Sequence, residues 1–406
     1  MRRVYFDYAA GAPLKPEVRE AMDRWLQVGK GNPSSLHQEG QESKREIDKS
    51  REIISSKLGC LFGELIFTSG GTESANQAIF GITQANKNFA RKKVLMSAIE
   101  HHCVLSTKRQ LEADGYEVCL VKVTPNGVLD LDDFKSKLDA NTLLVCCMHC
   151  NNEIGTFQPV LEVIQASHDI GAYVFMDAVQ TFGLLDETGS AWTVKSIPAD
   201  LISISAHKIG GPPGVGGLYI RSGLDVNPII HGGGQEREMR AGTESVINIV
   251  GFGVAASVID DGTDRGNLRD AFERLVECSG LNATLPLEIA RHPGISHFIC
   301  PYPFAESALI RLDQEGVAAA SGAACASGSI EPSHVLLACG FDDTVARAGL
   351  RFSFGSGLSA EDIEYGANVV NHVNGELIDI HTRQNSGPIS HENLPHLTPY
   401  GIGIDI

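Results

Sequence analysis

The sequence predicts an α/β protein with a mostly parallel β-sheet in a large domain and a smaller α+β domain beside it. Three observations support this prediction. Short apolar runs alternate with amphipathic stretches from about residue 60 to residue 220, which is typical of βαβ units. The chain has 43 glycines, and many of them cluster where these apolar runs end. After residue 250, longer helical patterns with few strands replace the alternation.

The large domain is predicted to span residues 13–250. A helix is expected at 41–58, where a charged stretch carries an apolar stripe at helical spacing. Apolar runs then predict strands at 65–67, 94–96, 143–148, 173–176, 201–204 and 217–220. Helical patterns at 74–86 and 106–114 lie between some of these runs. Since parallel strands need crossover connections, helices are expected on both faces of the sheet.

The small domain is predicted to combine residues 1–12 with residues 251–380. A polar break at 260–266 is expected to separate two helices, and further helical patterns occupy 267–278, 306–314 and 360–373. Residues 381–406 contain scattered prolines and glycines without hydrophobic periodicity. We expect this tail to be extended or disordered.

The composition argues against several classes of protein. Fifty acidic residues against 33 basic ones give a formal net charge of −17, which disfavours direct binding to nucleic acid. No signal-peptide pattern follows Met1 and no run of about 18 apolar residues is present, so we expect a cytoplasmic protein without a membrane span. The ten cysteines are then expected to be reduced thiols.

The cysteine-rich run at residues 146–150 has two interpretations. Cys-Cys-Met-His-Cys contains metal-ligating residue types, but the apolar residues before it predict a buried strand in which cysteine acts as a small hydrophobic residue. No second ligand pair follows at a spacing typical of zinc sites. We therefore expect no metal.

Three motifs at strand ends indicate the chemistry. Residues 67–74 (Phe-Thr-Ser-Gly-Gly-Thr-Glu-Ser) begin a helix, where glycine backbone, the Thr72 hydroxyl and the helix N-terminus suit a phosphate group. Lys208 follows a buried strand, where partial desolvation favours the amine that forms a Schiff base. Asp177 ends another strand and needs a cationic partner, such as a protonated pyridine nitrogen. Each motif alone is compatible with an ordinary turn, and their combination predicts a pyridoxal phosphate site.

With these motifs, the sequence resembles the pyridoxal-phosphate-dependent cysteine desulfurases of the NifS/IscS type. That resemblance implies a class V aminotransferase-like, fold-type-I architecture with a seven-stranded sheet. It runs from residue 5 to about residue 373, and the family landmarks occur in order at 31–35, 68–74, 100–101, 151–155, 177–180, 205–208, 240–244, 321–325 and 351–353. Gly210, Pro213, Ala241 and Ala323 depart from the residues usual in the family, and none of these departures removes a catalytic group.

The resemblance implies roles for individual residues. Lys208 would hold the cofactor and move protons, His101 would stack on its ring, and Asp177 would keep the ring nitrogen protonated. Arg351 would bind the substrate carboxylate bidentately, with assistance from Asn152. The other cofactor-binding residues implied are Gly71, Thr72, Gln180, Ser205, His207 and Thr243, the last supplied by the partner subunit of a homodimer.

For two of these roles, a second residue of the same type lies nearby in the sequence. Arg347 precedes Arg351 by four residues and would face the same way on a helix, so only the motif selects Arg351. His102 follows His101 directly and has no support from the family landmark.

The resemblance also identifies Cys325 as the nucleophile. This cysteine lies in residues 321–329, a run of small residues that suits an exposed, flexible loop better than a packed core. Its thiolate would attack the sulfur of the substrate, which leaves a persulfide on Cys325 and releases alanine.

The predicted function is therefore desulfuration of L-cysteine, with transfer of the sulfur to an acceptor or scaffold protein in iron–sulfur cluster assembly or a thiolation pathway. Selenocysteine lyase, or another pyridoxal phosphate lyase on the same scaffold, is the alternative. A non-catalytic scaffold subunit is a further one. The sequence leaves the destination of the sulfur open among iron–sulfur clusters, tRNA, thiocofactors and DNA.

Overall fold

The computed structural model describes residues 2–29, 31–86, 90–184, 191–260, 262–286, 288–303, 305–322 and 331–384. Its largest element is a seven-stranded sheet in which six strands share one direction and β8 runs against them. In spatial order the strands are β2 (Leu65–Thr68), β8 (Gly216–Ile220), β7 (Leu201–Ser205), β6 (Tyr173–Asp177), β5 (Thr142–Cys146), β3 (Lys93–Ser97) and β4 (Glu117–Val121). The α/β fold class expected from the sequence is confirmed.

Six of these strands lie where the sequence predicts them, with ends that differ by no more than two residues. The strand that sequence reasoning missed is β4, at the edge of the sheet. Only Val118 and Val121 of this strand are buried, while Glu117 and Leu120 are exposed, so it lacks the continuous apolar run of the inner strands. At the end of β5, Cys146 and Cys147 are completely buried, as expected of small hydrophobic residues.

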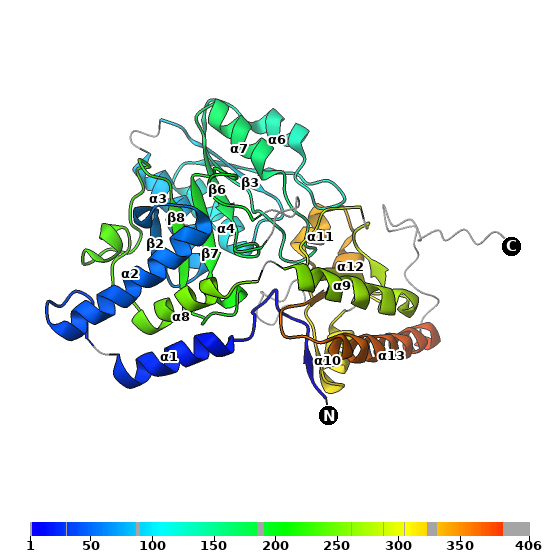
Figure 1. The fold of residues 1–406 in the computed structure, drawn as a ribbon. Helices are drawn as coiled ribbons and strands as arrows, with labels where there is room; N and C mark the ends of the chain where they lie inside the picture. Colours follow the sequence, from blue (N-terminus) through cyan, green and yellow to red (C-terminus); the bar gives the residue numbers. More distant parts are fainter. Residues whose placement is uncertain are drawn as a thin grey trace.

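Helices cover both faces of the sheet (Figure 1). One face packs against α3 (Gly71–Ala85), α4 (His102–Leu105) and α5 (Lys108–Ala113). The other packs against α1 (Pro16–Val28), α2 (Gln38–Leu58), α6 (Leu131–Lys137), α7 (Val160–Asp169) and α8 (Val246–Ser257). Helix α2 ends at Leu58 and is capped by Gly59, whose φ of 71° is the left-handed conformation that glycine adopts without steric cost.

A second core lies beside this sheet. It contains the three-stranded sheet of β12 (Gly349–Ser353), β10 (Ile295–Ile299) and β9 (Asn282–Ala283), packed with α9 (Thr263–Val276), α10 (Ala305–Gln314), α11 (His334–Ala338), α12 (Asp343–Ala346) and α13 (Ala360–Gln384). A cluster of aromatic rings fills its centre, with Phe272 in contact with Phe6, Phe298, Phe352 and Phe354.

The N-terminus of the chain packs into this second core. Strand β1 (Val4–Tyr5) pairs in parallel with β11 (Val317–Ala318), and the N-terminus lies beside α10 and α13 in Figure 1. Residues 7–12 then cross to the large sheet. Helix α13 extends to Gln384, so residues 381–384 of the expected tail are helical, and the remainder lies outside the described residues. Among the described helices, none combines the length and the apolar character needed to cross a membrane.

Candidate active site

The ends of β6 and β7, the start of α3 and residues from the second core enclose a cavity of about 260 Å³. This position, at the carboxyl ends of parallel strands, is where open α/β sheets bind ligands. Ten of the twelve site residues expected from the sequence line it: Gly71, Thr72, His101, Asn152, Asp177, Gln180, Ser205, His207, Lys208 and Arg351. Of the other two, Thr243 is exposed outside the lining, and Cys325 lies outside the described residues.

The turn between β2 and α3 forms one end of the cavity. Gly70 has a φ of 155°, and a Cβ on Gly71 would lie 2.8 Å from Val179 Cγ2, so a larger residue at 71 would collide with the opposite wall. Because α3 begins at Gly71, the backbone N–H groups of its first turn have no partner within the helix. Together with the Thr72 hydroxyl in the same wall, they suit an anion.

The end of β7 supplies the next group of side chains. Ser205 Oγ lies 2.8 Å from His207 Nδ1, at the entrance to the short 3-10 turn Ala206–Lys208. Burial, and then the nearby charge of Lys208, lower the pKa of His207 to about 4. His207 is therefore uncharged at neutral pH and contributes hydrogen bonds, not charge, to this end of the cavity.

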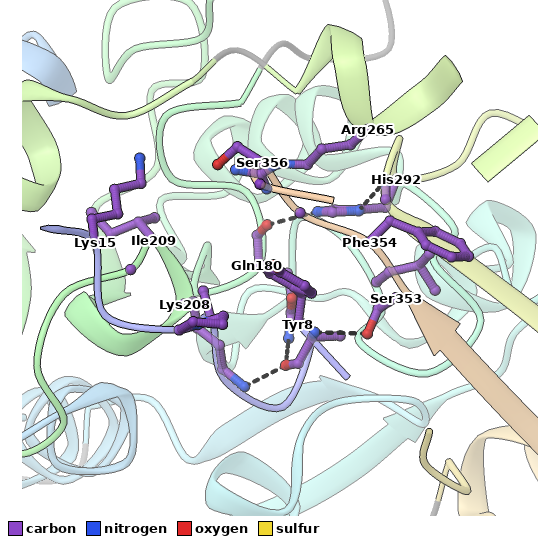
Figure 2. Close-up of a pocket in the computed structure, with 18 of the residues that line it drawn as sticks. Tyr8, Lys15, Gln180, Lys208, Ile209, Arg265, His292, Ser353, Phe354 and Ser356 are labelled. Carbon is purple, nitrogen blue, oxygen red and sulfur yellow. Dashed lines mark hydrogen bonds between the residues drawn. The ribbon is translucent and has the colours of Figure 1, made fainter. Parts of the chain in front are cut away.

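The backbone of Ala9 forms hydrogen bonds to Lys208 and Gln180 near the large sheet and to Ser353 in the second core. Its carbonyl oxygen accepts hydrogen bonds from Lys208 Nζ at 2.6 Å and from Gln180 Nε2 at 2.9 Å, while its N–H donates to Ser353 Oγ at 2.9 Å (Figure 2). Lys208 Nζ also lies 3.0 Å from the carbonyl oxygen of Ala10. The amine is therefore held at the cavity wall by two carbonyl groups from the N-terminal segment.

A second cavity, of about 220 Å³, is shown in Figure 2. Ala9, Gln180 and Lys208 line both cavities. The carbonyl oxygen of Gln180 lies 3.1 Å from His292 Nε2, and because His292 Nδ1 accepts a hydrogen bond from Gly294, Nε2 is the donor. Gln180, expected to bind the cofactor, is thus held by the protein through both its side-chain Nε2 and its backbone carbonyl.

Asp177 ends β6 as a buried carboxylate. Its Oδ1 accepts hydrogen bonds from Val179 N at 2.9 Å and from Ser203 Oγ at 3.0 Å, and it forms no ion pair with any described residue. A buried carboxylate without a cation is costly. Since Asp177 also lines the cavity, the site is built for a ligand that brings a positive charge to this wall.

His101 is the N-cap of α4 and lines the cavity. Its Nδ1 accepts a hydrogen bond from Cys103 N at 3.1 Å, so the proton of the neutral ring is on Nε2. Burial lowers the pKa of His101, which keeps the ring neutral at physiological pH. The neighbouring His102 is exposed and packs against His334, with ring centroids 4.6 Å apart, so it is His101 that faces the site.

Arg351 reaches the cavity from β12 of the second core, not from a helix. Its Nη1 donates to the Asn152 carbonyl at 2.8 Å and its Nη2 to Asp7 Oδ1 at 2.9 Å. Arg347 instead lies at the end of α12 and pairs with the exposed Asp343. Sequence reasoning missed Asp7 as a partner of Arg351. In the sequence, residue 5 marks only where the resemblance begins, and nothing local indicates that the carboxylate of Asp7 belongs to the site.

Several described cysteines are unsuited to act as nucleophiles. Burial raises the pKa of the Cys60 thiol to about 11, and those of the Cys300 and Cys339 thiols to about 12. A thiol with so high a pKa carries almost no thiolate at neutral pH. Gly322, three residues before Cys325, lines the cavity.

Comparisons with known proteins agree with this geometry. The model of the aminotransferase class-V family matches residues 4–365. The cysteine desulfurase IscS of Dictyoglomus turgidum is 42% identical over 379 residues, which cover 92% of this chain and 94% of that protein. A solved NifS-like protein superposes with a TM-score of 0.84 at 31% identity, covering 92% of this chain and all of that one. The structure of SspA in complex with cysteine gives a TM-score of 0.76 at 31% identity, covering 86% and 98%.

The fold and the lysine-centred cavity define a fold-type-I enzyme of the aminotransferase class-V type. Within that class, the chain belongs to the pyridoxal-phosphate-dependent cysteine desulfurase family.

Proposed function

We propose that this protein binds pyridoxal 5'-phosphate in the 260 Å³ cavity and converts L-cysteine to L-alanine, with the sulfur retained as a persulfide on Cys325. The observation that carries the proposal is the convergence of Lys208, Asp177 and Arg351 on one cavity from three separate strands or strand ends. An amine, an anion for a cationic ring and a carboxylate receptor are the three groups that such a reaction requires.

The residues present fit this cofactor. The turn at Gly70 and Gly71, the start of α3 and the hydroxyl groups of Thr72 and Ser205 offer an anion site. Asp177 lacks a cationic partner among the described residues and would accept a hydrogen bond from the protonated ring nitrogen. When bound, the cofactor supplies an electrophilic carbon for the amine of Lys208 and an electron-accepting ring.

The remaining side chains position the substrate and its protons. Arg351 would bind the carboxylate of cysteine, since its Nε is buried without a hydrogen-bond partner among the described residues. Lys208 Nζ would take the proton from Cα of the substrate and return one to the product. His101, neutral with its proton on Nε2, would lie against the ring and assist these transfers.

Cys325 would supply the thiolate that attacks the sulfur of cysteine. A sulfur–sulfur bond forms as the bond between Cβ and sulfur breaks, and the electron pair of the broken bond remains on Cβ, where protonation gives the methyl group of alanine. The thiol of Cys325 becomes a persulfide, so cysteine plus thiol gives alanine plus persulfide without an external oxidant. A second thiol, on an acceptor protein or a small molecule, would then remove the terminal sulfur.

Two partners complete the proposal. Thr243 is exposed and outside the cavity lining, which suits a contribution to the phosphate site of a second subunit in a homodimer. A sulfur acceptor or scaffold protein would receive the persulfide in the cytoplasm. The destination of the sulfur, whether iron–sulfur clusters or a thiolation pathway, depends on that acceptor.

The decisive experiment compares Cys325→Ala with Cys119→Ala, a control on the edge strand β4. Purified proteins are supplied with L-cysteine and excess dithiothreitol, and alanine and sulfide are measured. We expect Cys325→Ala to bind the cofactor and lose both products, and Cys119→Ala to retain them. Full activity of Cys325→Ala would contradict the persulfide mechanism. Turnover of selenocysteine by Cys325→Ala, with none of cysteine, would favour a selenocysteine lyase instead.

A further inference from the structure

A segment beside Ser69–Thr72, the proposed phosphate-binding turn, has an unusual backbone conformation. Glu236, Arg237 and Glu238 have φ values of 43°, 57° and 67°, in the left-handed region that residues with a Cβ rarely adopt. Three such residues in succession persist only where the surroundings hold them in place.

A buried ion pair anchors the segment to the large sheet. The guanidinium of Arg51, on α2, donates to both carboxylate oxygens of Glu236, at 2.7 and 2.8 Å, and Glu236 Oε2 also accepts from Phe67 N at 2.8 Å. Both side chains are almost completely buried. Arg51 Nη1 donates as well to the Leu65 carbonyl, so the pair links the segment directly to β2, the strand that leads into the phosphate-binding turn.

Arg240, two residues beyond the left-handed segment, contacts that turn through Glu73. Its Nε donates to Glu73 Oε1 at 2.8 Å and its Nη2 to Oε2 at 3.3 Å. Glu73 Oε2 also accepts a hydrogen bond from Ser69 N at 2.8 Å. Burial opposes ionisation of Glu73, but hydrogen bonds from Arg240 and Ser69 outweigh it and lower its pKa, so the carboxylate is charged at neutral pH.

This arrangement resolves an electrostatic conflict. Glu73 shapes the turn by fixing the N–H of Ser69, yet it follows Thr72 directly and places a negative charge next to the proposed phosphate site. Like charges so close disfavour binding of a phosphate dianion. Arg240 neutralises Glu73 and leaves the hydrogen bond to Ser69 intact.

We propose that Arg240 is a positioning residue for the phosphate-binding turn, which neutralises and orients Glu73 and is itself placed by the left-handed segment anchored through Glu236 and Arg51. This inference rests on the proposed function, because it assumes a cofactor phosphate at Ser69–Thr72. The ion pair of Arg240 and Glu73 thereby acquires a role in affinity for the phosphate group of the cofactor. This role is distinct from contact with the ring or the substrate.

The test compares binding of pyridoxal 5'-phosphate and of pyridoxal, which lacks the phosphate, to the cofactor-free protein by absorbance and fluorescence. For Arg240→Met we expect the Kd for pyridoxal 5'-phosphate to rise by about tenfold or more, since charge-assisted hydrogen bonds of this type are lost. The Kd for pyridoxal should change less than about twofold, because no phosphate is involved. The matched control is Arg24→Met, which breaks the exposed pair with Glu20 on α1 and should leave both values unchanged.

The double variant Glu73→Gln/Arg240→Met adds a second measurement. Removal of both charges should restore part of the affinity for pyridoxal 5'-phosphate that Arg240→Met loses, which general loosening of the fold would not do. Wild-type affinity in Arg240→Met, or an equal loss for both ligands without recovery in the double variant, would overturn the inference. If Arg240→Met does not fold, Arg240→Lys keeps the charge and is compared in the same way. Wild-type protein that binds both ligands equally would instead contradict the proposed cofactor site.

Discussion

Arg351 and Asp7 form a hydrogen-bonded ion pair of 2.9 Å in the wall of the cavity, although 344 positions separate them in the sequence. Asp7 belongs to the N-terminal segment, and Arg351 to β12 of the second core. The pair, with the bond from Arg351 Nη1 to the Asn152 carbonyl, fixes the plane of the guanidinium. Its Nε is buried without a hydrogen-bond partner among the described residues, and these two bonds use only one N–H of each Nη, so the guanidinium keeps donors for a substrate carboxylate.

The first prediction concerns recognition of this carboxylate. Arg351→Lys replaces a planar, bidentate donor with a point charge, so KM for L-cysteine should rise by about tenfold or more, with a smaller effect on kcat. Arg347→Lys is the matched control, since Arg347 pairs with Asp343 at the surface. Steady-state kinetics on both variants checks this. An increase confined to Arg347→Lys would show that the wrong arginine has been assigned.

A second prediction concerns stability in acid. Burial lowers the pKa of His297 to about 3, and His297 Nε2 has no hydrogen-bond partner among the described residues. Between about pH 6.5 and about pH 3 the unfolded chain binds a proton at this position that the folded protein does not, so stability falls as the pH falls through that range.

His297→Gln should therefore reduce the loss of stability between neutral pH and about pH 4, measured as the melting temperature at successive pH values. The control is His231→Gln at an exposed position, which should follow the wild-type curve. Parallel curves for His297→Gln and wild type would contradict the prediction. His292, buried with a pKa lowered to about 3, should behave like His297 when replaced.

The third prediction concerns the buried pair of Arg51 and Glu236. Arg51→Met leaves the carboxylate of Glu236 buried without its cation and should destabilise the protein by about 3–5 kcal/mol. Urea denaturation followed by far-UV circular dichroism measures this. The double variant Arg51→Met/Glu236→Gln should be destabilised less, because no uncompensated charge remains. A double variant as unstable as Arg51→Met would show that packing, not charge, accounts for the loss.

The fourth prediction concerns the left-handed backbone at Glu238. Its φ of 67° is unfavourable for glutamate and allowed for glycine, and the side chain is exposed. Glu238→Gly should raise stability by about 1 kcal/mol. Glu52→Gly, at an exposed position inside α2, should lower it by a similar amount, because glycine weakens a regular helix. Destabilisation by both changes would indicate that the Glu238 side chain makes a contribution of its own.

The sequence by itself determined the large sheet and the part of the cavity built from strand ends. Continuous apolar runs mark buried parallel strands, and residues just beyond such strands meet at one edge of the sheet. Gly71, Thr72, Asp177, Ser205 and Lys208 therefore converge for reasons that are local to each motif. The edge strand β4 was not predicted, because its exposed positions do not need apolar side chains and so interrupt the apolar run.

The tertiary structure alone decided how the second core completes this cavity. Nothing in residues 5–10 indicates that Asp7 will pair with Arg351 or that the Ala9 carbonyl will hold Lys208 and Gln180. Helical spacing suggested one face for Arg347 and Arg351, yet pairing of β12 with β10 places Arg351 alone at the cavity. Contacts between segments hundreds of residues apart depend on how the two cores pack, and no local periodicity in a single sequence encodes that packing.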